Sequence, residues 1–127
     1  MTARQVLITG GAGSLGQELG LRLYQSGHRL TVLDLPSRDF GSLEALDGVR
    51  VVRGDITDPD AMASAVSDVD VVIHLAALLP PASERDRELT WAVNVTGTEN
   101  LVEALVRAGR DAHLVFSSSV CVYGDTS

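Results

Sequence analysis

Short apolar runs along the chain alternate with longer segments in which apolar residues recur every three or four positions. The short runs predict strands, and the longer periodic segments predict helices. The predicted strands span 5–9, 29–34, 49–53, 70–76 and 113–117, and the predicted helices span 14–26, a segment from 58 onward, and 88–108. This alternation is typical of a parallel sheet with crossover helices, an α/β fold.

Helix ends carry residues that favour them. Asp58 precedes Pro59, which places a capping side chain before a proline in the first helical turn. Gly27 and Gly109 follow the first and last helical segments, where a left-handed residue commonly ends a helix. The other connections are predicted to be a loop with at most a short helix over 36–47 and a proline-containing loop over 78–85.

Helical spacing also predicts which residues are buried. In the helix that begins at Asp58 the buried stripe is Met62, Ala65, Val66 and Val69. In the long segment 88–108 the stripe is Leu89, Ala92, Val93, Thr96, Leu101, Ala104, Leu105 and Ala108.

Right-handed crossovers place the five strands in the order 3-2-1-4-5, a doubly wound Rossmann-type sheet in one domain over 1–127. Ligands of such sheets bind at the carboxyl ends of the strands, beside the point where the strand order reverses. The residues that follow the strands are a glycine-rich turn, Asp34, Asp55, Ala76-Ala77 and Ser117–Ser119. We expect them to converge on one crevice. The fifth strand is expected to form an exposed apolar edge of Leu114, Val115 and Phe116.

Composition argues against several classes of function. The chain has 127 residues, 45% of them apolar, and a net charge of −7, which argues against a nucleic-acid surface because phosphate binding needs a basic patch. No apolar run is long enough to span a membrane and no secretory signal is visible, so no membrane partner is expected. With Cys121 as the single cysteine, a cytoplasmic protein is expected. All ten basic residues are arginine, which excludes any mechanism that needs a lysine of this chain.

The turn after the first predicted strand reads Thr9-Gly10-Gly11-Ala12-Gly13-Ser14-Leu15-Gly16. Its glycines fit two registers, a three-residue repeat at Gly10, Gly13 and Gly16 or a G-x-G-x-x-G pattern that starts at Gly11. A glycine turn between strand and helix binds phosphate, because the backbone can approach a pyrophosphate and the helix N-terminus presents N–H groups to it. The alternative is an ordinary strand–helix turn that needs glycine for its geometry. The context favours a dinucleotide.

Two carboxylates at strand ends are candidates for binding the adenosine of that dinucleotide. Asp34 lies 18 residues after Gly16, where a carboxylate accepts the ribose hydroxyls and repels a 2′-phosphate, which favours NAD over NADP. Arg38 argues the other way, because an arginine can pair with a 2′-phosphate. Asp55 either accepts from the adenine amino group, with Ile56 packing on the ring, or caps backbone N–H groups of its own turn.

Few other side chains suggest chemistry. His74 lies inside an apolar run, and the other histidines stand at no metal-ligand spacing, which favours a hydrogen-bonded core histidine and no metal site. Ser117–Ser119 and Tyr123 are the acid–base candidates. A serine at a strand end either binds a substrate oxygen or caps the backbone. Cys121 has no evident base partner.

Five motifs in order cover nearly the whole chain. They are 9–16 (TGGAGSLG), 54–56 (GDI), 70–77 (DVVIHLAA), 94–101 (NVTGTENL) and 116–124 (FSSSVCVYG). On these motifs the chain resembles the extended short-chain dehydrogenase/reductase family, the NAD-dependent epimerase/dehydratase group. Around the serine run it is similar to UDP-glucose 4-epimerases.

The resemblance assigns roles to the residues that match. It implies that Gly10, Gly13 and Gly16 hold the NAD pyrophosphate, that Asp34 binds the adenosine ribose, and that Asp55 and Ile56 bind the adenine. Leu75, Ala76 and Ala77 would line the path to the nicotinamide ribose, and Asn94 would lie on the helix behind the active site. Ser14, Leu15 and Ser117 belong to the same implied cofactor-binding set. Ser119 matches the catalytic serine, which orients the substrate oxygen. Ser14 departs from the aromatic or aliphatic residue usual there, and could cap the first helix.

The larger departure is a missing motif. The family's catalytic base is a tyrosine in a Tyr-x-x-x-Lys helix, where lysine lowers the pKa of the tyrosine. This chain has no lysine, and no lysine follows Tyr123 at that spacing. We therefore expect the chain to be the cofactor-binding N-terminal portion of a longer enzyme, inactive alone and without the C-terminal substrate region. The resemblance implies hydride transfer on a small-molecule substrate, a nucleotide sugar, and a homodimeric parent. The alternative is a non-catalytic NAD(P)-binding module or sensor.

Overall fold

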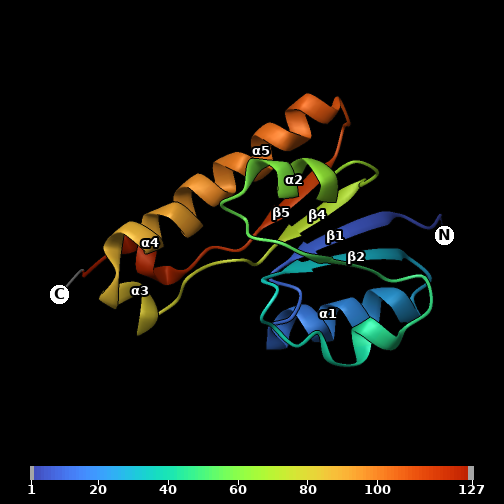
Figure 1. Cartoon of the computed structure of the whole chain (residues 1–127), viewed down its shortest axis with the longest axis horizontal. Coiled ribbons are helices and arrows are strands. Elements are labelled where there is room, and N and C mark those ends of the chain that lie inside the picture. Colours follow the sequence, from blue (N-terminus) through green and yellow to red (C-terminus); the bar gives the residue numbers. More distant parts are fainter. Residues whose placement is uncertain (1, 126–127) are drawn as a thin grey trace.

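The computed structural model describes residues 2–125, which form an α/β fold built on one parallel sheet (Figure 1). The five strands stand in the order β3-β2-β1-β4-β5, as the sequence predicts. Their bounds are β1 Gln5–Thr9, β2 Arg29–Asp34, β3 Arg50–Arg53, β4 Val71–His74 and β5 His113–Phe116. All neighbouring strands pair in parallel.

Three strands are shorter than predicted. β3 begins at Arg50 rather than Val49, β4 spans only 71–74, and β5 ends at Phe116. At the end of β4 the ladder stops for a local reason. β1 ends at Thr9, opposite His74, and the Thr9 hydroxyl instead accepts a hydrogen bond from Ala76 N at 3.1 Å.

Helices cover both faces of the sheet (Figure 1). α1 Ser14–Gln25 and a 3₁₀ turn, η1 Gly41–Ala45, lie on one face, and α2 Pro59–Ala65 and α5 Gly97–Ala108 lie on the other. β1 serves both layers because successive side chains of a strand point to opposite faces. Val6 and Ile8 pack on the α1 side, whereas Leu7 packs with the residues of α2 and α5.

The helix-end predictions are confirmed at three positions. The Asp58 carboxylate accepts from Asp60 N and Pro59 occupies the first turn of α2. Gly27 and Gly109 have φ of +88° and +65°, the left-handed conformation that ends a helix. The predicted stripe of α2 is buried throughout, since Met62, Ala65, Val66 and Val69 are at most 2% exposed.

The predicted helix over 88–108 is confirmed in its extent, but a π-helical turn that the spacing did not predict lies in its middle. The chain forms α3 Ala82–Arg85 within the predicted loop, then α4 Arg87–Trp91, a π-helical turn Ala92–Thr96, and α5. Leu101, Ala104 and Leu105 are buried as predicted. Ala92, Val93 and Thr96 are only half-buried and Ala108 is exposed, so the stripe is buried only in part. Leu89 is 47% exposed. The reason is visible in Figure 1, where α3 and α4 extend past the carboxyl ends of the strands and have no sheet beneath them.

The predicted exposed edge is confirmed for two of its three residues, whereas Leu114 packs against the core. β5 ends the sheet, and its residues Val115 and Phe116 are 45% and 58% exposed. Among the helices of residues 2–125, none has the length and apolar character needed to cross a bilayer.

Candidate functional site

The strand ends converge as the topology predicts. In the parallel register Thr9 lies beside Leu33 on one side and beside His74 on the other, and His74 lies beside Phe116. The glycine turn, Asp34, the segment after His74 and the serine run therefore begin at one edge of the sheet. This edge is where ligands of doubly wound sheets bind.

The glycine turn is held tightly by its neighbours. Gly10 has a φ of +68°, and a Cβ on it would lie 2.9 Å from Ala76 N. A Cβ on Gly16 would collide with Gly10 O and lie 2.8 Å from Gly11 Cα, so glycine at 16 allows α1 to start against the turn. Glycines at 10 and 16 are thus required by the fold itself.

Gly13 differs from these glycines. Its φ is −72°, which any residue adopts, and a Cβ on it would meet only Gly10 O at 3.4 Å. The packing of the described residues therefore does not explain this glycine. It stands at the N-cap of α1, where backbone N–H groups lack helical partners. Such a helix N-terminus favours an anion.

Ser14 and Leu15 begin α1 beside this space. Ser14 does not cap the helix, because the N-cap is Gly13 and no side chain makes the capping hydrogen bond. The expectation that Ser14 is a cap is therefore wrong. Leu15 is 59% exposed next to the glycine turn.

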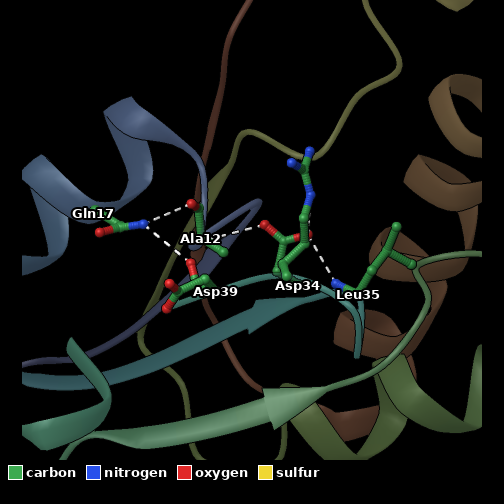
Figure 2. A network of polar contacts seen from close by, with 6 residues as sticks. Ala12, Gln17, Asp34, Leu35 and Asp39 are labelled. Carbon is green, nitrogen blue, oxygen red and sulfur yellow. Dashed lines mark hydrogen bonds and ion pairs between the residues drawn. The ribbon is translucent and has the colours of Figure 1, made fainter. Parts of the chain in front are cut away.

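Asp34 joins the glycine turn to the end of β2 (Figure 2). Its Oδ2 accepts from Ala12 N at 3.0 Å and its Oδ1 accepts from Leu35 N at 2.8 Å. Gln17 supports the same turn, since its Nε2 donates to Ala12 O at 2.8 Å and to Asp39 O at 3.2 Å. The carboxylate is thus oriented before any ligand arrives.

Arg38 forms a long ion pair with the Asp34 carboxylate. Its Nε stands 3.9 Å from Asp34 Oδ1, while the Arg38 side chain remains 61% exposed. A long, exposed contact of this kind contributes little stability. Asp34, whose side chain is only 12% exposed, is therefore the better fixed of the two groups.

Asp55 makes the turn contacts that the sequence left open. Its Oδ1 accepts from Thr57 N at 2.9 Å and from Thr57 Oγ1 at 2.8 Å. The prediction that the Ile56 side chain packs on the adenine ring is wrong. Its side chain is 5% exposed and packs against Gly97 in the core, so it is not placed to lie on an adenine ring.

The segment after β4 is anchored at both ends. Leu75 N and Ala76 N each donate to Thr9 Oγ1 at 3.1 Å. At the other end, Asn94 Oδ1 accepts from Leu78 N at 2.7 Å and Asn94 Nδ2 donates to Leu78 O at 3.1 Å. The path that the sequence assigns to Leu75, Ala76 and Ala77 is therefore a fixed wall.

The serine run lies across a groove from this wall. A cavity of about 270 Å³ is lined by Ala76, Ala77, Asn94 and Ser117–Ser119, among others. The Ser117 hydroxyl donates to His74 O at 3.4 Å, and the Ser119 hydroxyl accepts from Cys121 N at 3.2 Å. The groove thus brings six candidate residues together: Ala76, Ala77, Asn94 and Ser117–Ser119.

His74 is the buried, hydrogen-bonded histidine that the sequence favours. It is 2% exposed, and its ring contacts Thr9 on β1, Thr98 on α5 and Phe116 on β5. None of these three neighbours titrates. Burial lowers the pKa of His74 below its usual value, so the ring is neutral at pH 7.

Three residues of this site were not singled out from the sequence: Thr9, Gln17 and Thr98. Thr9 carried a usable signal, since it is the one hydroxyl in its strand, follows the apolar run Val6–Ile8 and directly precedes the glycines. Gln17 and Thr98 carried none, because a polar residue on a helix is ordinary until its partners are known.

The chain matches known proteins over most of its length. The sequence profile described as the NAD dependent epimerase/dehydratase family matches residues 6–127. A 3 beta-hydroxysteroid dehydrogenase/Delta 5-->4-isomerase from Mycobacterium tuberculosis is 42% identical over 125 residues, which cover 94% of this chain and 33% of that protein. The chain thus spans about a third of this curated relative.

Two solved structures show the same fold. The Bordetella bronchiseptica enzyme WbmG in complex with NAD has a TM-score of 0.85 and 29% identity, over 97% of this chain and 40% of its own. A UDP-glucose-4-epimerase from Stenotrophomonas maltophila, with bound NAD and formylated UDP-arabinopyranose, has a TM-score of 0.84 and 33% identity, over 98% and 39%. With the matched profile and the glycine turn, these findings show that the chain belongs to the NAD-dependent epimerase/dehydratase family, whose cofactor is NAD.

Proposed function

We propose that the protein is an oxidoreductase of the epimerase/dehydratase type, which moves hydride between NAD and a hydroxyl-bearing carbon of a nucleotide sugar. One observation carries the proposal: a single edge of the sheet holds the glycine turn, the oriented Asp34 and the Ser119 groove. The first two suit a dinucleotide, and the groove offers hydroxyl groups to a second molecule.

The adenosine half of NAD is assigned to the β1–β2 side. The pyrophosphate would lie over Gly13 at the N-terminus of α1, where the helix dipole favours an anion. Asp34 would accept from the ribose hydroxyls with a carboxylate that already holds the glycine turn. Asp55 would bind the adenine amino group beside its turn contacts, and Ile56 would contribute backbone rather than side chain.

The other half of NAD is assigned to the groove at the ends of β4 and β5. When bound there, the cofactor supplies a nicotinamide ring that accepts or donates hydride. Ser119 would orient the substrate oxygen. Its Oγ accepts from Cys121 N, which fixes the oxygen and leaves its own proton to donate to a substrate.

The proton-transfer step needs a further group. Because the chain has no lysine, a tyrosine–lysine pair cannot form within it. We therefore expect these 127 residues alone to bind NAD without turning a substrate over, whereas the whole protein is the catalyst. The family match supports this enzyme over a non-catalytic binding module.

The substrate class is supported by the neighbour that holds a UDP sugar. The relative that is 42% identical is named for a hydroxysteroid instead. Both substrates carry a secondary alcohol, so the proposed chemistry is shared and the assay distinguishes the two.

The remaining proposals concern assembly and location. A homodimer through the long helical segment is supported by its exposed apolar residues: Val102 and Val106, four positions apart on α5, are 41% and 74% exposed, and Trp91 of α4 is 63% exposed. A cytoplasmic location is supported by the single cysteine, Cys121, which leaves no pair for an internal disulfide.

Two measurements test the proposal. Isothermal titration of the folded chain should show binding of NAD and weaker binding of NADP. The whole protein should then epimerise or oxidise UDP sugars with NAD and leave 3β-hydroxysteroids unchanged. A folded chain that gives no heat with either cofactor would overturn the proposal, and turnover of steroids alone would replace the substrate.

A further inference from the structure

The ring of His74 bridges two elements that are distant in the sequence. Its Nδ1 lies 2.6 Å from the Thr9 hydroxyl of β1, and its Nε2 lies 2.9 Å from the Thr98 hydroxyl of α5. The Phe116 ring stacks on it at 5.6 Å between centroids and 20° between planes. Both ring nitrogens therefore form hydrogen bonds within the protein, and the neighbouring groups determine which nitrogen carries the proton.

The other contacts of Thr9 determine which atom carries the proton in its hydrogen bond with His74 Nδ1. A hydroxyl has one proton and two acceptor positions. Thr9 Oγ1 accepts from Ala76 N and from Leu75 N, each at 3.1 Å, although Leu75 N is shared with Thr9 O. With its acceptor positions taken, Thr9 donates its proton to His74 Nδ1.

The Thr98 side leads independently to the same result. The Thr98 hydroxyl donates to Asn94 O at 2.8 Å, so toward the ring it can only accept. His74 Nε2 must then carry a proton. Burial of the ring favours the neutral form. The two sides together specify one tautomer, with Nε2 protonated and Nδ1 bare.

This tautomer completes a directed chain of hydrogen bonds. It runs from Ala76 N to Thr9, through the ring to Thr98, and on to the backbone of Asn94. The Asn94 side chain then holds Leu78 at both its N and its O. Both ends of the groove wall over 75–78 are therefore attached to the one histidine.

We propose that His74 is a positioning residue for the nicotinamide half of NAD: as the Nε2–H tautomer it fixes the wall over 75–78 against which that half lies. This inference rests on the proposed binding of NAD. It assigns no such role toward the adenosine half, because Asp34 and Gln17 hold the glycine turn at Ala12 independently of Thr98, even though Ala76 also packs against Gly10.

The experiment compares two ligands on one set of variants. ADP covers the adenine, ribose and pyrophosphate, whereas NAD adds the nicotinamide riboside. Thr98→Val removes the hydroxyl that accepts from His74, and Thr98→Ser keeps it. Thr96→Val is the matched control, since Thr96 lies in the preceding turn and makes no side-chain hydrogen bond among residues 2–125.

We expect Thr98→Val to bind NAD roughly three- to tenfold more weakly, as for the loss of one buried hydrogen bond, and to bind ADP like the wild type. Thr98→Ser and Thr96→Val should keep the wild-type ratio of the two affinities. Equal weakening of both ligands, or of neither, would show that His74 has only a structural role. A wild-type chain that binds neither ligand refutes the NAD proposal itself.

The tautomer is tested without any variant. A long-range proton–nitrogen NMR spectrum of the wild-type chain should show His74 with protonated Nε2 and bare Nδ1 at pH 7. A proton on Nδ1, or a ring that exchanges between both forms, contradicts the directed chain and overturns the inference.

Discussion

Replacing Gly13 by alanine distinguishes a glycine that the fold requires from one that cofactor binding requires. The other glycines of the turn cannot serve, since a Cβ at Gly10 or Gly16 collides with backbone. At Gly13 the backbone φ of −72° suits alanine, and the new Cβ would meet Gly10 O at 3.4 Å, an ordinary contact. Any large effect of this change must therefore come from the ligand.

The two expected magnitudes differ. Alanine is a poorer N-cap than glycine by about 0.5–1 kcal/mol. Alanine also reduces the conformational entropy of the unfolded chain, which stabilises the fold by about 0.4–1 kcal/mol and offsets that cost. We therefore expect the free energy of unfolding of Gly13→Ala to stay within about 1 kcal/mol of the wild type. A methyl group in the pyrophosphate space should weaken NAD at least about tenfold, which is about 1.4 kcal/mol.

Urea unfolding measures the first quantity, and isothermal titration with NAD measures the second. Gly48→Ala is the control, because Gly48 has a φ of +81° and a Cβ there meets nothing within 4 Å. It should lose about 1–2 kcal/mol of stability through left-handed strain and bind NAD normally. If folded Gly13→Ala binds NAD like the wild type, the pyrophosphate does not lie over Gly13 and the assignment of the turn is wrong.

The other predictions concern three side chains of the site. Asp34→Ala should bind NAD about tenfold more weakly and shift the preference toward NADP in titrations, because the carboxylate that repels a 2′-phosphate is gone. Asp39→Ala is the control. An unchanged preference of Asp34→Ala would contradict the role of Asp34. The stability that His74 contributes as a neutral ring should be complete above about pH 6.5 and fall at lower pH by at most about 1.4 kcal/mol per unit, because the unfolded chain binds the proton first. Urea unfolding from pH 5 to 8 should show this slope in the wild type and not in His74→Gln; equal slopes refute it. Ser119→Ala in the whole protein should lower kcat about 10²- to 10⁴-fold with unchanged NAD affinity, whereas Ser118→Ala should not, and full activity of Ser119→Ala would remove its catalytic role.

Much of the site could be predicted because it depends on local pattern. The glycine turn, Asp34 and the serine run each follow an apolar strand, and the parallel topology alone brings strand ends to one edge. The direction of a side chain at such an edge was less predictable. Ile56 follows Asp55, which we propose to bind adenine, yet the Ile56 side chain fills the space beside Gly97 in the core.

The sequence by itself determined the strand order, the helix ends at Gly27 and Gly109, and the strand ends that gather at one edge of the sheet. These follow from periodicity and from the conformations that single residues prefer. Only the tertiary structure decided how the crevice is held. Thr9 and His74 are 65 positions apart and Thr98 is 24 further on, so their hydrogen bonds exist only after β1, β4 and α5 have packed. Contacts between such distant residues depend on the joint placement of several elements, which no local pattern records.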